Sequence, residues 1–311
     1  MRKKSIEQLK EIVKGEVLLN EPLSKHTSFR IGGPAEIFCR PVDAEDIKNI
    51  LNWAKRNRQP VTPIGNGTNL LVSDDGISGV VIQLSNNISG IEFDSNSVFV
   101  KSGNTIKDLI NAAMKRGLGG IEFAWGIPGA IGGSIVMNAG TNSHFLSKFV
   151  KYVQVIDFNG KEYKLLHDDL KFDYRYSILQ DEPLILTEAV LSLEKADEEE
   201  IKKAISDASN KRKGKQPLEY PCAGSIFKNP PTTYAGKILE EAKCKGMRVG
   251  DAMISELHAN FIVNLGHATA IDVLTLIRKA QETVYKQKDL ILELEVRLLG
   301  DFNTNLLLKK K

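Results

Sequence analysis

Apolar residues recur every three or four positions in several stretches of the chain, the spacing of one helix face. Residues 43–57 show this clearly, with Asp43 in position to cap the first turn. Residues 105–117 begin with Thr105 and Asp108 at capping-box spacing and end on a glycine. Helices are predicted over 43–57, 105–117, 197–214 and 269–289, and the same period runs through residues 6–13.

Other stretches are continuously apolar or alternate apolar with polar residues, the patterns of buried and half-buried strands. The pair Asn159-Gly160 interrupts one of them and favours a hairpin within 153–166. Further strands are predicted over 79–84, 97–103, 184–193, 260–265 and 291–299. Helices and strands do not alternate regularly, so their order predicts an α+β fold.

Composition adds limits on the class of protein. The 311 residues are 42% hydrophobic and 26% charged, typical of a globular protein of about two domains. The charged stretch 194–216 is expected to be a domain junction, a solvent-exposed helix, or both. The net charge of +3 gives no electrostatic reason for a nucleic-acid or membrane partner. Without an apolar signal region or a run of 18 apolar residues, we expect a cytoplasmic protein.

The cysteines and histidines give no sign of a metal site. Cys39, Cys222 and Cys244 lack the spacing of metal ligands, which predicts structural thiols in a reducing compartment. His26 and His258 stand near no candidate nucleophile in the sequence, and we interpret both as structural.

Two glycine-rich segments stand out, "PIGNGTNLLV" (63–72) and "GIPGAIGGSIVMNAG" (126–140). Glycine allows close approach to the backbone, and successive exposed amides can bind a phosphate. The first segment has Leu70 where a dinucleotide-binding motif needs its third glycine, and neither segment is a P-loop. A diphosphate site and tight turns without a ligand both fit this pattern.

Two further segments are unusual. Residues 211–231 form a long non-periodic stretch with Lys, Tyr, Ser, Asn and four prolines, and such loops are often functional. "FDYRYS" (172–177) places Arg175 between two tyrosines, where it is either an anion-binding residue or a surface residue stacked on aromatic rings.

Seven segments along the chain are distinctive: "HTSFRIGGPA" (26–35), "PIGNGTNLLV" (63–72), "GIEFAWGIPGAIGGSIVMNAG" (120–140), "YRYS" (174–177), "YPCAGSIFKNP" (220–230), "HANFIVN" (258–264) and "LELEVRLLG" (292–300). Taken together, they resemble the UDP-N-acetylenolpyruvoylglucosamine reductase (MurB) family in its shorter form. The resemblance runs from about residue 20 to residue 300, with the motifs in the family's order.

The resemblance implies an FAD-binding region of the vanillyl-alcohol-oxidase (PCMH) type in two subdomains, followed by a C-terminal α+β substrate-binding domain. The implied parts are a lead-in with a helix (1–25), the FAD-binding region (26–194, divided near 85), the substrate-binding domain (195–302) and a tail (303–311). The residues implied to bind FAD are Gly65, Asn66, Gly67, Thr68, Asn69, Gly126, Ile127, Pro128, Gly129, Gly132 and Gly133.

The implied reaction passes hydride from NADPH to FAD and then from flavin N5 to the enolpyruvyl group of a nucleotide sugar. By motif match, Arg175 is the cation for the charge that develops on the substrate carboxylate. Ser225 matches the proton donor, assisted by Lys215 or Lys228. Glu295 is implied to have a protonated or hydrogen-bonding role. Glu293 would share its strand face, so the choice of Glu295 rests on the motif match.

Substrate-binding residues are implied at Tyr174, Lys215, Lys228 and Asn229. The implied partner is a small nucleotide sugar, with no nucleic acid, membrane or obligate protein partner. Trp125 and Cys222 depart from the smaller or more polar residues we expect there, and neither removes a catalytic residue. The alternatives are another flavin enzyme of the same superfamily, such as a sugar-lactone oxidase, and a non-catalytic nucleotide-sugar or flavin-binding module. The first would not need the motifs around Arg175, Ser225 and Glu295 together.

Overall fold

The computed structural model describes residues 2–85, 87–141, 144–304 and 307–308. The chain forms two compact units, each built from separate segments. Unit 1 contains Met1–Leu19, Ile37–Asn66 and Gly79–Arg212, and unit 2 contains Asn20–Glu36, Gly67–Ser78 and Lys213–Lys311. The domain boundary predicted near residue 195 falls before the helix that ends unit 1, whereas the unit boundary follows that helix.

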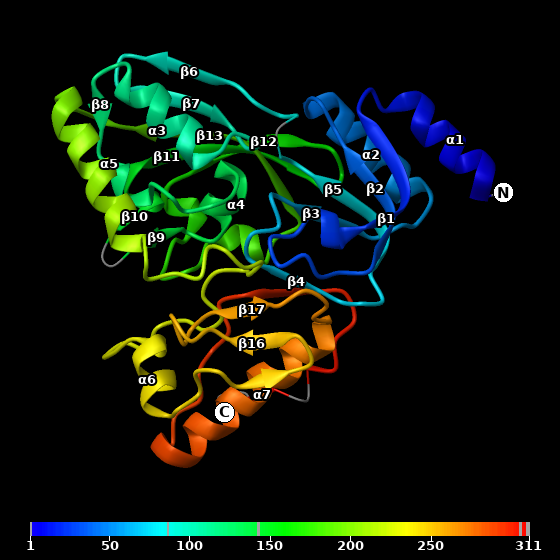
Figure 1. The fold of residues 1–311 in the computed structure, drawn as a ribbon. Helices are drawn as coiled ribbons and strands as arrows, with labels where there is room; N and C mark the ends of the chain where they lie inside the picture. The colour runs from blue at the N-terminus through cyan, green and yellow to red at the C-terminus, as the bar shows by residue number, and fades with distance from the viewer. Residues whose placement is uncertain (1, 86, 142–143, 305–306, 309–311) are drawn as a thin grey trace. The chain divides into compact units, whose positions relative to one another are not determined.

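Figure 1 shows the elements in chain order. The α-helices are α1 (Arg2–Ile12), α2 (Ala44–Arg56), α3 (Ile106–Met114), α4 (Ile131–Val136), α5 (Glu198–Arg212), α6 (Ala235–Glu241) and α7 (Ala270–Lys288). The strands are β1 (Glu16–Pro22), β2 (Pro34–Arg40), β3 (Val61–Ile64), β4 (Leu70–Val72), β5 (Ile77–Gln83), β6 (Ile91–Asp94), β7 (Ser97–Lys101), β8 (Leu118–Gly119), β9 (Gly140–Thr141), β10 (His144–Phe145), β11 (Val150–Asp157), β12 (Glu162–Leu166), β13 (Leu184–Ser192), β14 (Glu194–Lys195), β15 (Arg248–Val249), β16 (Ala252–Ile254), β17 (Ile262–Asn264) and β18 (Arg297–Leu299). Short 3-10 turns are η1 (Leu23–Lys25), η2 (Glu122–Ala124), η3 (Leu146–Phe149), η4 (Asp168–Leu170) and η5 (Ile178–Gln180).

Unit 1 is organised around two sheets. A five-stranded sheet has the order β12-β11-β13-β7-β6, and the predicted hairpin pairs Val153 with Leu165 across β11 and β12. Helices α3 and α4 contribute Ile106, Leu109 and Ile131 to one core with the apolar residues of this sheet (Figure 1). A second sheet has the order β1-β2-β5-β3, and its core includes the buried faces of α1 and α2.

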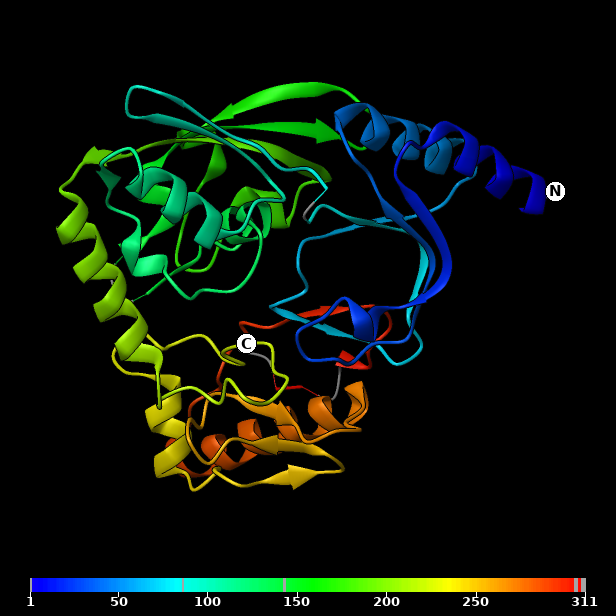
Figure 2. The ribbon, with the colours of Figure 1, turned by 45° about the horizontal axis from the view of Figure 1, so that its top comes forward.

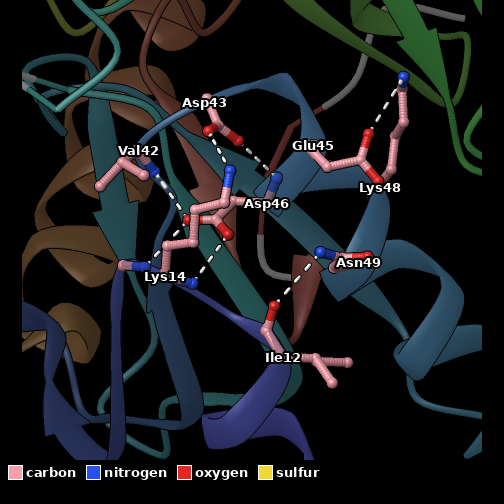
Figure 3. Close-up of polar contacts among 9 residues, drawn as sticks. Ile12, Lys14, Val42, Asp43, Glu45, Asp46, Lys48 and Asn49 are labelled. Carbon is pink, nitrogen blue, oxygen red and sulfur yellow. Dashed lines mark hydrogen bonds and ion pairs between the residues drawn. The ribbon is translucent and has the colours of Figure 1, made fainter.

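A buried carboxylate holds the start of α2 in place (Figure 3). Asp46 is fully buried and accepts the backbone amides of Lys14 at 2.8 Å, Gly15 at 2.9 Å and Val42 at 3.1 Å. Asp43 is the N-cap that the sequence predicts, because its side chain accepts the Asp46 amide at 2.8 Å. These bonds connect the turn after α1 to the turn before α2, and they provide an acceptor for three backbone amides.

Unit 2 is smaller and is built around a three-stranded sheet, β15-β16-β17, with α7 against it in both views (Figures 1 and 2). Its core combines Ile254 and Ile262 of the sheet with Val273 and Ile277 of α7. Strand β18 pairs in parallel with β4 in the same unit. Within the described residues, no helix is long and apolar enough to cross a membrane.

The predicted helices are confirmed to within two residues at their N-terminal ends, and the predicted strand over 291–299 is largely wrong. Only Arg297–Leu299 of that stretch forms a strand. Upstream of it, Leu294 makes an isolated bridge to Phe227, and Leu292 and Val296 point into the core. The alternation of apolar residues therefore reflects burial of one side of an irregular segment. Only Arg297–Leu299, at the end of this segment, pairs as a strand.

Candidate functional site

The first glycine segment connects β3 to β4, and its glycines have different environments. Gly67 has φ +65°, and a Cβ there would collide with the His26 carbonyl, so its own packing requires glycine. A Cβ on Gly65 would lie 3.8 Å from Ala130 Cβ and 4.0 Å from Gly133 N, which leaves room. Backbone packing thus explains Gly67, while Gly65 leaves an open backbone surface.

The second glycine segment surrounds α4, a helix that the sequence pattern did not predict. A Cβ on Gly132 would lie 3.0 Å from Ser102 Cβ, and the Gly132 amide donates to the Ser102 carbonyl at 2.9 Å. A Cβ on Gly133 would meet nothing within 4 Å. Gly132 is therefore needed for packing against Ser102, and Gly133 faces open space beside Gly65.

These surroundings fit a dinucleotide such as FAD. Gly65 and Gly133 are neighbours within unit 1, and a side chain on Gly133 would occupy open space beside them. Asn66 Oδ1 is buried and has no hydrogen-bond partner among the residues that the structure describes. A buried acceptor without a donor is costly, and a hydroxyl or amino group of a bound dinucleotide would satisfy it.

The other predicted FAD contacts lie along the same segments. Gly126 and Gly129 have φ values of +79° and +126°, which glycine adopts readily. Ile127 is half-buried and Pro128 is exposed. Thr68 and Asn69 are half-buried and belong to unit 2.

Arg175 is held against the end of the second glycine segment. Its Nη2 donates to the Gly140 carbonyl at 3.1 Å, and its guanidinium carbon lies 5.3 Å from the centre of the Tyr174 ring. Its backbone has φ +57°, and Gln180 Nε2 donates to its carbonyl at 3.0 Å. Tyr176 donates to Asp181 at 2.6 Å, and this bond raises the pKa of Tyr176. The backbone at Arg175 is thus fixed in a conformation that directs the guanidinium toward Gly140.

Ser225 and Glu295 are brought together in unit 2 by backbone pairing. Ser225 bridges Phe261, and the next residue, Ile226, accepts the Glu295 amide at 2.8 Å. Asn69 of the first glycine segment donates from Nδ2 to the Glu295 carbonyl at 3.1 Å. Residues 226 positions apart are therefore neighbours, and a glycine-loop residue contacts the Glu295 backbone directly.

Glu293 and Glu295 differ in exposure. Glu293 is exposed, and its carbonyl accepts the Lys228 amide at 2.8 Å, whereas Glu295 is half-buried. The predicted strand that would have placed both on one face is absent at these positions. The more buried residue is the one that the motif match selects.

The remaining candidates lie in or near the irregular segment 213–230. Lys215 is exposed and Lys228 is half-buried, and neither ammonium makes an ion pair or hydrogen bond with another described residue. Asn229 Oδ1 accepts the Ala235 amide at 3.0 Å, at the start of α6. Burial raises the pKa of the Cys222 thiol, so this cysteine stays protonated near neutrality.

Both histidines have local partners. His26 Nε2 lies 3.1 Å from Glu21 Oε1, and His258 Nδ1 accepts the Asn260 amide at 3.2 Å. Burial lowers the pKa of His258, which favours the neutral ring that this bond requires. One residue near the site, Arg212, was not among the sequence-based candidates, although it lies within the unusual segment 211–231 and packs on Gly126.

Comparisons with known proteins agree along nearly the whole chain. A family model described as the C-terminal domain of UDP-N-acetylenolpyruvoylglucosamine reductase matches residues 216–299, and one described as an FAD binding domain matches residues 35–165. A UDP-N-acetylenolpyruvoylglucosamine reductase of Caldanaerobacter subterraneus subsp. tengcongensis is 43% identical over 95% of this chain and 98% of its own length. The protein of that name from Bacillus licheniformis is also 43% identical, over 96% of this chain and 99% of its own length.

Solved structures show the same likeness. The crystal structure of UDP-N-acetylenolpyruvylglucosamine reductase (MurB) from Thermus caldophilus has a TM-score of 0.79 at 36% identity and covers 92% of this chain and 99% of that chain. Physcomitrella patens BBE-like 1 has a TM-score of 0.50 at 16% identity over 61% of this chain and 44% of that chain, which shows a shared fold alone. The predicted α+β fold, with a PCMH-type FAD-binding region and a separate C-terminal domain, is confirmed.

Proposed function

This chain belongs to the UDP-N-acetylenolpyruvoylglucosamine reductase (MurB) family of oxidoreductases, and we propose that it reduces UDP-N-acetylglucosamine enolpyruvate to UDP-N-acetylmuramate for peptidoglycan precursor synthesis. NADPH would be the hydride donor and FAD the bound cofactor. The observation that carries the proposal is 43% identity to a reductase of this name along 95% of the chain.

We propose that the two glycine segments hold FAD. The open backbones at Gly65 and Gly133 and the unpartnered Asn66 Oδ1 support this assignment. When bound, FAD would accept hydride from NADPH and pass it from N5 to the enolpyruvyl carbon. The matches at residues 35–165 and 216–299 lie within the FAD-binding region proposed for 26–194 and the substrate-binding domain proposed for 195–302.

Arg175 is proposed to stabilise the negative charge that hydride addition places on the substrate carboxylate. Its planar guanidinium suits a carboxylate, and such fixed charges are most effective when they are oriented before the reaction. The bond to Gly140 and the left-handed backbone give Arg175 this fixed position in unit 1.

Ser225 is proposed to donate the proton to the carbon that carries this charge, and Glu295 to act as a protonated or hydrogen-bonding neighbour. The pairing of Ile226 with Glu295 supports joint positioning of the two side chains. A serine hydroxyl is a weak acid, so Lys215 or Lys228 is proposed to assist it, and both ammonium groups are available in the described structure. Tyr174, Asn229 and these two lysines are the proposed nucleotide-sugar contacts.

An anaerobic experiment tests the proposal. The protein is purified, its flavin is reduced with NADPH, and UDP-N-acetylglucosamine enolpyruvate is added. We expect reduction by NADPH and rapid reoxidation by the enolpyruvyl substrate. Reduction without reoxidation would remove this substrate and favour another flavin enzyme, and a protein that cannot be reconstituted with FAD would remove the flavin assignment.

A further inference from the structure

Arg212 ends helix α5 and covers Gly126 in the second glycine segment. The point that a Cβ on Gly126 would occupy lies 3.3 Å from Arg212 Cδ and 3.5 Å from Nη1. Gly126 is exposed and has φ +79°, a conformation that glycine adopts readily, and it has no side chain between its backbone and Arg212. A guanidinium therefore lies directly on a glycine of the segment that we assign to dinucleotide binding.

The packing of α5 fixes the position of Arg212. Ile201 is the buried residue of this helix, and Ile201 Cγ1 lies 3.3 Å from the point that a Cβ on Gly119 would occupy. Eleven residues later, about 16 Å along the helix axis, Arg212 reaches Gly126. The helix thus lies alongside residues 119–126, next to β8 in Figure 1 and on the left in Figure 2.

The Arg212 side chain makes no hydrogen bond or ion pair with any other residue in the described parts of the chain, 2–85, 87–141, 144–304 and 307–308. It is half-buried, and this burial lowers the pKa of its guanidinium. Partial burial of a cation without a counter-charge is unfavourable, and an anion bound beside it would remove that cost.

The other charged groups of this segment provide no counter-charge for Arg212. Glu122 is turned to the Gly120 amide, which donates to both carboxylate oxygens at 2.9 and 3.0 Å. Lys107, an exposed residue of α3, holds its ammonium 5.8 Å from the centre of the Trp125 ring. Two cations therefore lie beside residues 125–126, and the acidic residue of the segment is already engaged.

We propose that Arg212 binds phosphate oxygens of a dinucleotide at the second glycine segment. This inference rests on the proposed function and adds a residue to it. The phosphate belongs either to the diphosphate of FAD or to the extra ribose phosphate that distinguishes NADPH from NADH. A guanidinium suits either source, because it can donate two parallel hydrogen bonds to one phosphate.

The test compares Arg212→Gln, Arg212→Lys and the control Lys211→Gln, which removes the same charge from the exposed neighbour on α5. Each apoprotein is titrated with FAD and with riboflavin, which lacks the diphosphate, by flavin fluorescence. Each FAD-loaded variant is then reduced anaerobically with NADPH and with NADH. Thermal unfolding of the apoproteins checks that all three variants fold like the wild type.

We expect Arg212→Gln to weaken one phosphate-dependent step about 10- to 100-fold, with partial rescue in Arg212→Lys and no change in Lys211→Gln. If Arg212→Gln binds FAD more weakly and riboflavin unchanged, Arg212 contacts the diphosphate of FAD. If it binds FAD unchanged and loses the preference for NADPH over NADH, Arg212 contacts the ribose phosphate of NADPH. If Arg212→Gln matches the wild type in both arms, the inference is overturned while the reductase function stands. If the wild type does not bind FAD, the proposed function fails, and the inference fails with it.

Discussion

Gly133→Ala separates folding from cofactor binding, because a methyl group at this position meets no protein atom within 4 Å. Gly133 lies in α4, and replacing a helical glycine with alanine stabilises a helix by about 0.5–1 kcal/mol. The apoprotein should therefore be as stable as the wild type or slightly more stable. In the complex, the same methyl would occupy space next to Gly65 that we assign to FAD. Overpacking of this kind costs about 1–3 kcal/mol, which corresponds to about 5- to 150-fold weaker FAD binding.

The assay measures urea unfolding of the apoprotein and FAD affinity by flavin fluorescence for each variant. Gly132→Ala is the matched control, because its methyl would lie 3.0 Å from Ser102 Cβ in a buried position. That control should lose stability before any cofactor is added. Wild-type FAD affinity in Gly133→Ala would refute the placement of FAD beside Gly133, and a destabilised Gly133→Ala apoprotein would refute the packing argument.

Three other changes test separate features. Asp46→Ala removes a buried acceptor that serves three backbone amides and should cost about 3–5 kcal/mol in urea unfolding, whereas Glu45→Gln at the exposed neighbour should change stability by less than about 0.5 kcal/mol. Ser225→Ala should leave flavin reduction by NADPH intact and slow substrate reduction about 100- to 10,000-fold in stopped-flow traces, and equal loss of both steps would contradict the proton-donor role. Burial lowers the pKa of His258, so the unfolded chain takes up a proton that the folded chain resists. Stability should therefore be full above about pH 6.5 and fall as the pH drops toward the lowered pKa, and this fall should be smaller in His258→Gln.

The N-terminal ends of the helices were predictable because capping signals are local in the sequence. Asp43 caps α2, and Thr105 with Asp108 forms the capping box of α3, as the sequence spacing predicts. Thr269 forms a second capping box with Asp272 at the start of α7. A cap is made by residues within one turn of the helix, so it can be identified from the sequence without knowledge of the fold.

Features that depend on distant residues could not be predicted in this way. Helix α4 is rich in glycine and is held at its start by the carbonyls of Ser102 and Asn104, which accept the amides of Gly132 and Ile131. The contact between Asn69 and Glu295 joins positions 226 residues apart, and no periodicity shows it. Only the resemblance to a family assigned these distant motifs to one function, and even that resemblance did not single out Arg212.

Because unit 2 is built from segments far apart in the sequence, its core can form only late in synthesis on the ribosome. Phe29 and Leu71 belong to the same core as Val296, which is translated about 225 residues after Leu71. At about 5–20 residues per second, the early segments wait about 10–45 s for their partners. During that interval their apolar side chains lack the surface that buries them in the finished protein. Unit 2 therefore completes its core only after residue 296 has been made, and residues 20–36 and 67–78 wait longest for their packing partners.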